Sequence, residues 1–142
     1  LMEETGAVLL TRDDEAYPKR LNEFTSAPPV LFCKGDIAHL SAPSAAFVGT
    51  RRATDYGIRM TRKLAGGVAE AGLCIVSGMA AGIDTIAHKA ALEHGTPTVA
   101  VFGCGVDVIY PVGNGDLADG NISGTECRCG GNVPRHGRCR SA

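Results

Sequence analysis

Three features that would assign this chain to a protein class at once are scarce or missing. Its formal net charge is −1, so any polyanion must be held by a local patch rather than by the whole surface. No apolar run approaches the roughly 18 residues that span a bilayer, and the N-terminus lacks a basic region followed by an apolar stretch. We therefore expect a soluble, cytoplasmic protein without a membrane anchor. Aromatic residues make up 5%, which leaves few rings for stacking against a ligand.

The cysteines do not form a recognisable metal motif. Three lie in apolar stretches and are interpreted as small buried side chains: Cys33, Cys74 and Cys104. Cys127 and Cys129 are separated by one residue instead of the two that a zinc knuckle uses, although His136 and Cys139 follow nearby. Structural cysteines are favoured over zinc, and we expect no metal and no other cofactor.

The remaining composition is that of a globular domain. The chain has 142 residues, of which 44% are hydrophobic and 20% charged, enough for one domain with a core. Short apolar runs alternate with helical patterns. Strands are predicted at residues 7–10, 30–33, 45–48, 73–76 and 98–102, and helices at about 56–71 and 83–93. This alternation predicts a Rossmann-like α/β fold with a doubly wound, mostly parallel sheet.

The first long helix has recognisable ends. Thr54 or Asp55 can cap its start, and Gly72 is a plausible residue to end it. Its buried face is predicted from the apolar spacing: Ile58, Leu64, Val68 and Ala71.

Glycine-bearing turns follow three of the predicted strands, at the edge where parallel sheets bind ligands. Glycine lets a phosphate approach the main chain, and unpaired helix N–H groups attract anions. The candidate phosphate-binding residues are Gly49, Thr50, Arg51, Arg52, Ser77, Gly78 and Gly82. The alternative is that the arginines are ordinary solvated charges and that Ser77 and the glycines only permit tight turns.

Asp84 and His88 stand four residues apart on the second predicted helix, so their side chains can meet. No third ligand or nucleophile is evident, and we interpret them as a hydrogen-bonded pair that organises the loop rather than as catalytic or metal-binding groups. Gly103 and Gly105 supply half of a dinucleotide fingerprint without its third glycine or an acidic ribose partner, so NAD is not expected.

Several of these segments occur together in a known order. They are Phe-Val-Gly-Thr-Arg (47–51), Val-Ser-Gly-Met-Ala-Ala-Gly-Ile-Asp (76–84), Ala-His (87–88) and Gly-Val-Asp-Val-Ile-Tyr-Pro (105–111). Together with Tyr17-Pro18 and the run 29–35, this set resembles the bacterial DNA-processing protein A (DprA/Smf) family. The resemblance covers about residues 7–117, which implies a partial Rossmann-like domain over 1–117.

The resemblance implies a function without covalent chemistry. Members of that family bind single-stranded DNA and deliver it to a RecA-type recombinase during natural transformation, and the intact family forms homodimers. The chain would then not be an enzyme. Because phosphates can be held by amides and arginines without reading the bases, sequence-independent contacts are expected, with Arg51 as the favoured phosphate ligand.

Residues 118–142 depart from the family pattern. Members continue through further strands and a Phe-Pro, Arg-Asn-Arg segment, whereas this stretch is rich in glycine, arginine and cysteine and has no apolar periodicity. We expect an irregular, disordered tail and a sheet incomplete on its C-terminal side. A shifted or shortened reading frame is our hypothesis for its origin.

Two other functions stay open. A Rossmann-like hydrolase of nucleoside monophosphates shares the phosphate-binding edge and needs an acidic group with a Gly-Thr-Glu loop, which occurs here at 124–126 in the tail. The other alternative is an inactive remnant in which the turns are purely structural.

Overall fold

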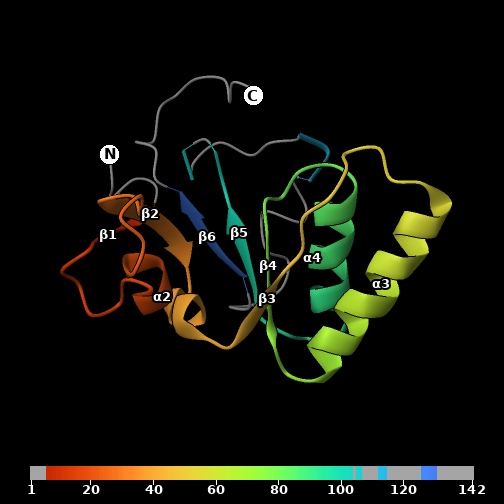
Figure 1. Ribbon diagram of the computed structural model, residues 1–142, viewed down its shortest axis with the longest axis horizontal. Coiled ribbons are helices and arrows are strands. Elements are labelled where there is room, and N and C mark those ends of the chain that lie inside the picture. Colours follow the sequence, from red (N-terminus) through yellow and green to blue (C-terminus); the bar gives the residue numbers. More distant parts are fainter. Residues whose placement is uncertain (1–5, 104, 107–111, 115–125, 131–142) are drawn as a thin grey trace.

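The computed structural model describes residues 6–103, 105–106, 112–114 and 126–130. These residues form a sheet with two long helices against one of its faces (Figure 1). The strands are β1 (Val8–Thr11), β2 (Val30–Gly35), β3 (Ser44–Ala46), β4 (Cys74–Ser77), β5 (Thr98–Val101) and β6 (Glu126–Gly130). The helices are α2 (Lys19–Asn22), η1 (Ile37–Ser41), α3 (Asp55–Glu70), α4 (Ile83–Glu93) and η2 (Val112–Asn114).

The sheet is mixed, with strand order β1-β2-β6-β5-β4-β3. Strands β3, β4, β5 and β6 run parallel to one another. Strand β2 pairs antiparallel with both of its neighbours, β1 and β6. Ala46 pairs with Val76, which pairs in turn with Val99. The predicted Rossmann-like α/β class is confirmed. Within the described residues, α3 and α4 pack against each other and against β4, so both crossover helices cover the same face.

Helix α3 begins and ends where its sequence predicts. The Thr54 hydroxyl accepts a hydrogen bond from the Gly57 amide at 3.2 Å, which satisfies one unpaired donor of the first turn. After the C-cap Ala71, Gly72 has a φ of +75°, the left-handed conformation typical of a helix end.

The predicted buried face of α3 is only partly right: Val68 packs against the core and Ile58 is half-buried, whereas Leu64 and Ala71 are exposed. Leu64 is 57% exposed. The residues that α3 buries are smaller ones: Thr61, Ala65, Gly66 and Ala69. Of these, Ala65 and Ala69 pack with Ala87, Ala90 and Ala91 of α4 and with Ile75 of β4. Small side chains let the two helices approach each other closely, so the tightest contact selects alanine and glycine rather than leucine.

The opposite face of the sheet is covered by the N-terminal part of the chain. Tyr17 is buried there and donates a hydrogen bond from its hydroxyl to the Pro28 carbonyl at 2.6 Å. Cys33 and Cys74 lie in the same cluster, and burial raises the pKa of each thiol to about 11. Their predicted role as small buried side chains is confirmed, whereas Cys104 lies outside the described residues.

Strand β6 differs from the expected irregular tail. Glu126–Gly130 lies between β2 and β5 and pairs with both. Backbone N–H and C=O groups make these ladders, so an extended segment can complete them without an apolar pattern. The prediction for residues 118–125 and 131–142, which include His136 and Cys139, falls outside the described part of the chain. Among the described residues, no helix is both long and apolar enough to cross a membrane.

Candidate nucleic-acid interface

Two turns meet at the carboxyl edge of the sheet. Because β3 and β4 run parallel, their C-terminal ends lie at the same edge. The arginine turn, residues 48–52, follows β3, and the glycine turn, residues 78–82, follows β4. Much of the turn after β5, namely residue 104 and residues 107–111, falls outside the described residues.

The two turns are in direct contact. The Ile83 amide donates to the Thr50 carbonyl at 3.2 Å. Gly82 has a φ of +84°, and a Cβ added there would collide with the carbonyl oxygens of Thr50 and Arg51. A Cβ on Gly49 would lie 2.6 Å from Cγ1 of Ile83. Both glycines are therefore required by close approach, and the arginine turn rests on the start of α4.

Asp84 organises hydrogen bonds inside the glycine turn. Its carboxylate oxygen Oδ2 accepts from the amides of Gly78 at 3.2 Å and Ala80 at 3.4 Å. The side chain is buried, so both amides and the charge are satisfied within the protein. A carboxylate in the first turn of α4 also faces the positive end of the helix dipole.

Three further residues hold this turn. Met79 is fully buried with a φ of 60°, an unusual conformation for a residue with a side chain. Asn114 donates from Nδ2 to the Met79 carbonyl at 2.9 Å and to the Thr85 hydroxyl at 2.8 Å, and Thr85 donates to the Ala80 carbonyl at 2.7 Å. Sequence reasoning did not assign these roles, because Asn114 is 35 residues from Met79 along the chain and no local pattern links them.

Two candidate phosphate ligands already have protein partners. The Ser77 hydroxyl donates to the Phe47 carbonyl at 2.7 Å, and Ser77 is 4% exposed. The Gly78 amide is used by Asp84. A phosphate could take either donor only by displacing these partners. This geometry places Ser77 and Gly78 in the support of the edge, in contrast to their expected contact with a ligand.

The expected pairing of Asp84 with His88 is wrong. His88 Nδ1 lies 2.7 Å from the Thr98 hydroxyl, which itself donates to the Ile75 carbonyl at 2.8 Å. The Thr98 oxygen therefore accepts from His88, which puts the imidazole proton on Nδ1 and leaves Nε2 as an acceptor. His88 turns inward to β5 rather than to the loop, because its position on α4 faces the sheet.

His88 is held neutral by its surroundings. The side chain is fully buried, and Nε2 has no hydrogen-bond partner. Burial lowers its pKa from 6.5 to about 4, since the charged imidazolium would lose its hydration. A neutral imidazole beneath the edge supplies no charge to an anion.

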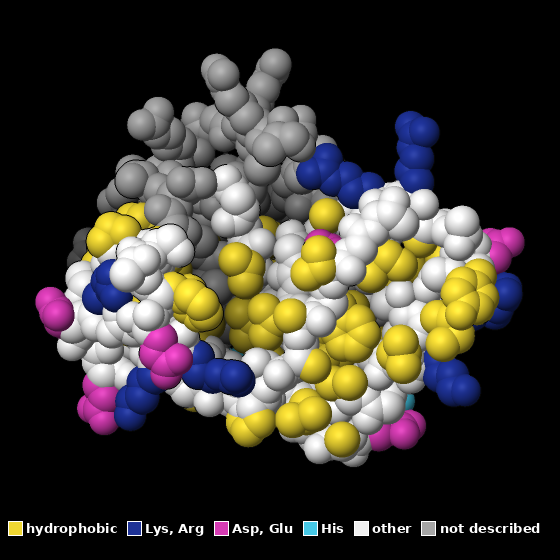
Figure 2. Space-filling model, viewed as in Figure 1, with side chains coloured by type: hydrophobic (Ala, Val, Ile, Leu, Met, Phe, Trp, Pro, Cys, Tyr) yellow, Lys and Arg dark blue, Asp and Glu magenta, His cyan; other side chains and the backbone are white. Residues whose placement is uncertain are grey.

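The arginine turn, in contrast to the glycine turn and His88, is exposed to solvent. Val48 is 89% exposed, and Thr50, Arg51 and Arg52 are exposed too. The Thr50 hydroxyl accepts from the Arg52 amide at 3.1 Å, which shapes the turn locally. Neither arginine forms an ion pair with any described residue. Figure 2 shows basic side chains standing clear of the upper surface, where Figure 1 places the turn between β3 and α3.

The chemistry of this edge suits an anion. It presents two guanidinium groups on a turn that is fixed from below by Gly82 and Ile83. Within the described part of the chain, no group of three histidine, cysteine, aspartate or glutamate side chains is arranged to hold a metal ion. The Gly-Thr-Glu tripeptide at 124–126 starts in residues that the structure does not describe.

The chain is similar to proteins of one family along most of its length. Residues 8–127 match the family model described as DNA recombination-mediator protein A. Protein Smf of Synechocystis is 46% identical over 112 residues, a match that covers 76% of this chain and 28% of that protein. DNA processing protein DprA of Streptococcus pneumoniae is 46% identical over 106 residues, covering 75% of this chain and 37% of that protein. The chain thus spans little more than a third of these relatives at most.

Solved structures have the same fold. The X-ray structure of DprA from Streptococcus pneumoniae superposes with a TM-score of 0.82 and 39% identity, over 89% of this chain and 44% of that one. DNA processing protein A from Helicobacter pylori, whose structure is described in terms of a unique single-stranded DNA binding mode, gives a TM-score of 0.72 at 30% identity. That match covers 92% of this chain and 59% of the other.

Proposed function

Because the chain belongs to the DNA recombination-mediator protein A family, we propose that it binds single-stranded DNA through phosphate contacts at the arginine turn. Arg51 and Arg52 are the charged ligands, and the main chain of Gly49 and Thr50 lies alongside them at the surface. Ser77, Gly78, Gly82 and Asp84 act from below as its support.

One observation carries this proposal. Two arginines that form no ion pair with a described residue project from a turn whose backbone is held to α4 through the contacts of Thr50 with Gly82 and Ile83. A fixed backbone lowers the entropy cost of holding a phosphate, and exposed guanidinium groups release counterions from DNA when they bind. The proposed contacts are to phosphates, which every nucleotide carries, so binding should be independent of base sequence.

The later step is a finer proposal. Transfer of the bound strand to a RecA-type recombinase, during DNA uptake, is supported by the family description as a recombination mediator. No covalent step is included, because Asp84 already holds two amides and His88 is buried away from the surface. The relatives are longer, and the chain covers 28% and 37% of the two compared above.

A salt titration tests the proposal. Fluorescence anisotropy with labelled oligo-dT measures the association constant at several salt concentrations. The logarithm of this constant should fall linearly with the logarithm of the salt concentration, by about 0.7 per phosphate neutralised. Arg51→Ala should weaken binding about five- to tenfold and reduce that slope by about 0.7.

The matched control is Lys63→Ala, which removes an exposed charge from the middle of α3 and should leave both quantities nearly unchanged. A parallel assay with nucleoside monophosphates measures hydrolysis. Turnover of nucleotide, or a folded Arg51→Ala variant with unchanged DNA affinity and slope, contradicts the proposal.

A further inference from the structure

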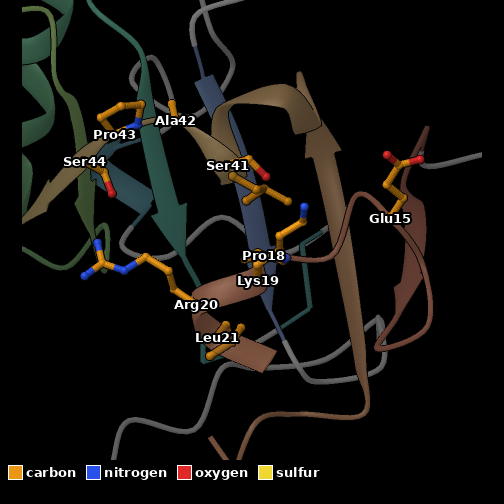
Figure 3. Close-up of a pocket in the computed structure, with 10 residues that line it drawn as sticks. Glu15, Pro18, Lys19, Arg20, Leu21, Ser41, Ala42, Pro43 and Ser44 are labelled. Atoms are coloured by element: carbon orange, nitrogen blue, oxygen red, sulfur yellow. The ribbon is translucent and has the colours of Figure 1, made fainter. Parts of the chain in front are cut away.

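A second basic site lies at the other end of β3. A cavity of about 770 Å³ opens between α2 and the segment that leads into β3 (Figure 3). Its lining residues are Glu15, Pro18, Lys19, Arg20, Leu21, Leu40, Ser41, Ala42, Pro43 and Ser44. The cavity is open to solvent and is separate from the arginine turn, which follows the opposite end of the strand.

The cavity combines cations, hydroxyls and an apolar floor. Lys19 and Arg20 are exposed, and neither forms an ion pair with a described residue. Figure 3 shows Arg20 extending towards the end of the cavity where Ser44 lies, with Glu15 at the opposite end. Leu21 is half-buried in the lining. Charged donors beside an apolar surface suit a ligand that has both phosphates and flat bases.

The edge strand β3 connects this cavity with the arginine turn. Ser44 lines the cavity and starts β3, and Gly49, five residues later, approaches the Ile83 side chain closely. At about 3.3 Å per residue the separation is roughly 17 Å. Since stacked nucleotides rise about 3.4 Å each, about five of them cover this span.

The surface along this line accepts a nucleic-acid strand. Residues 44–50 include no charged side chain, and Ser44, Ala46 and Val48 are exposed. Figure 2 shows mainly hydrophobic and uncharged atoms between the upper basic side chains and those at the lower centre. A polyanion that leaves the arginine turn along β3 therefore meets no repelling charge on that strand before it reaches Arg20.

We propose that the cavity beside α2 is a second phosphate-binding site for the same DNA strand, which runs along β3 from the arginine turn to Lys19 and Arg20. The inference rests on the proposed function, because it extends that interface. It sets a minimum length, since only oligonucleotides that reach past about five nucleotides engage both sites. Once one site holds a long strand, the other site meets it at a high effective concentration. The affinity for long strands therefore rises without any new contact at the arginine turn.

Oligonucleotide length separates the two sites. Anisotropy is measured with dT4 and dT12 for the wild-type chain and for the Lys19→Glu/Arg20→Glu variant. The variant should bind dT12 at least tenfold more weakly than the wild type, with a smaller salt slope, and should bind dT4 as the wild type does. Arg62→Glu/Lys63→Glu on α3 is the matched control, because it reverses the charge of an adjacent, exposed arginine and lysine on the helix-covered side of the sheet.

Each outcome decides the inference. A length-dependent loss in the Lys19→Glu/Arg20→Glu variant but not in Arg62→Glu/Lys63→Glu supports it. An equal loss at both lengths, or a loss no larger than in the control, overturns it and leaves the cavity to another ligand, such as an acidic peptide. Circular dichroism checks that the Lys19→Glu/Arg20→Glu variant is folded. If it is not, Lys19→Gln/Arg20→Gln, which removes both charges without reversing them, is measured in its place. Failure of the proposed function looks different, because wild-type dT12 would not bind or Arg51→Ala would have no effect.

Discussion

The arginine turn and the glycine turn lie at the same edge of the sheet and differ in almost every physical respect. In the glycine turn, the amides of Gly78 and Ala80 are bonded to a buried carboxylate, and Met79 is fully buried. In the arginine turn, Val48, Arg51 and Arg52 are exposed and carry no ion partners among the described residues.

From this difference we assign a supporting role to the glycine turn and propose the DNA contact at the arginine turn. A turn whose donors are already bonded contributes rigidity, and a turn that rests on it can present charges without collapsing. Changes in the glycine turn should therefore act first on stability, and changes in the arginine turn should act on DNA affinity. The following predictions test this division.

The largest effect is expected for Gly82→Ala. The new Cβ meets the Thr50 and Arg51 carbonyls, and the φ of +84° is strained for alanine, so unfolding free energy should fall by about 3 kcal/mol or more. Urea denaturation followed by circular dichroism measures it. Gly67→Ala is the control, because nothing lies within 4 Å of that Cβ and the helix should gain about 0.5–1 kcal/mol. Similar changes in both variants would contradict the assignment.

Acid should destabilise the packing of α4 against the sheet, where His88 is buried beside Thr98. The folded pKa of His88 is about 4, against 6.5 for the exposed group, so below pH 6.5 the unfolded chain binds a proton that the folded chain does not. The contribution is complete above pH 6.5 and is lost as the pH falls to about 4, a change of up to about 3 kcal/mol. Urea denaturation at several pH values measures it. His88→Gln should lose less stability across that window, and identical pH profiles would count against the prediction.

Asp84→Ala should cost about 2 kcal/mol, because it leaves the Gly78 and Ala80 amides without their acceptor. Asp84→Asn keeps one acceptor oxygen and should cost less. Thermal unfolding of the two variants gives the ranking. A stability equal to that of the wild type for Asp84→Ala would mean that the carboxylate does not hold the turn.

The smallest stability change is expected for Arg51→Ala. Its side chain is exposed and forms no ion pair with a described residue, so the unfolding free energy should change by no more than about 0.5 kcal/mol, while DNA affinity falls. Chemical denaturation and anisotropy on the same preparation compare the two. A loss of stability comparable to that of Asp84→Ala would erase the division between the turns.

Local patterns predicted the regular elements well. The cap at Thr54, the left-handed Gly72 and helix α4 over Ile83–Glu93 all follow from short-range rules about unpaired helix ends. The buried face of α3 could not be predicted in the same way. Leu64 is the more apolar side chain, yet Ala65 is buried. The facing surface of α4 consists of alanines, so the two helices pack closely and leave room only for small side chains between them.

The hydrogen-bond partners of Asp84 and His88 could not be predicted from local sequence patterns either. Four-residue spacing predicted a contact between Asp84 and His88, but it says nothing of competitors from other elements. The Asp84 carboxylate accepts hydrogen bonds from amides of the preceding turn, and the His88 imidazole is hydrogen-bonded to Thr98 on β5. Strand β6 was missed for a related reason, since its ladder is made by backbone groups that carry no side-chain pattern.

By itself the sequence determined the order of strands β1 to β5 and of helices α3 and α4, the glycine-bearing turns between them and the presence of two arginines after β3. Periodicity and chain-ending residues encode these features locally. Only the tertiary structure decided which donors in the two turns are already bonded within the protein, because their partners lie on other elements. Ser77 and Gly78 find partners on neighbouring elements, whereas Arg51 and Arg52 find none among the described residues.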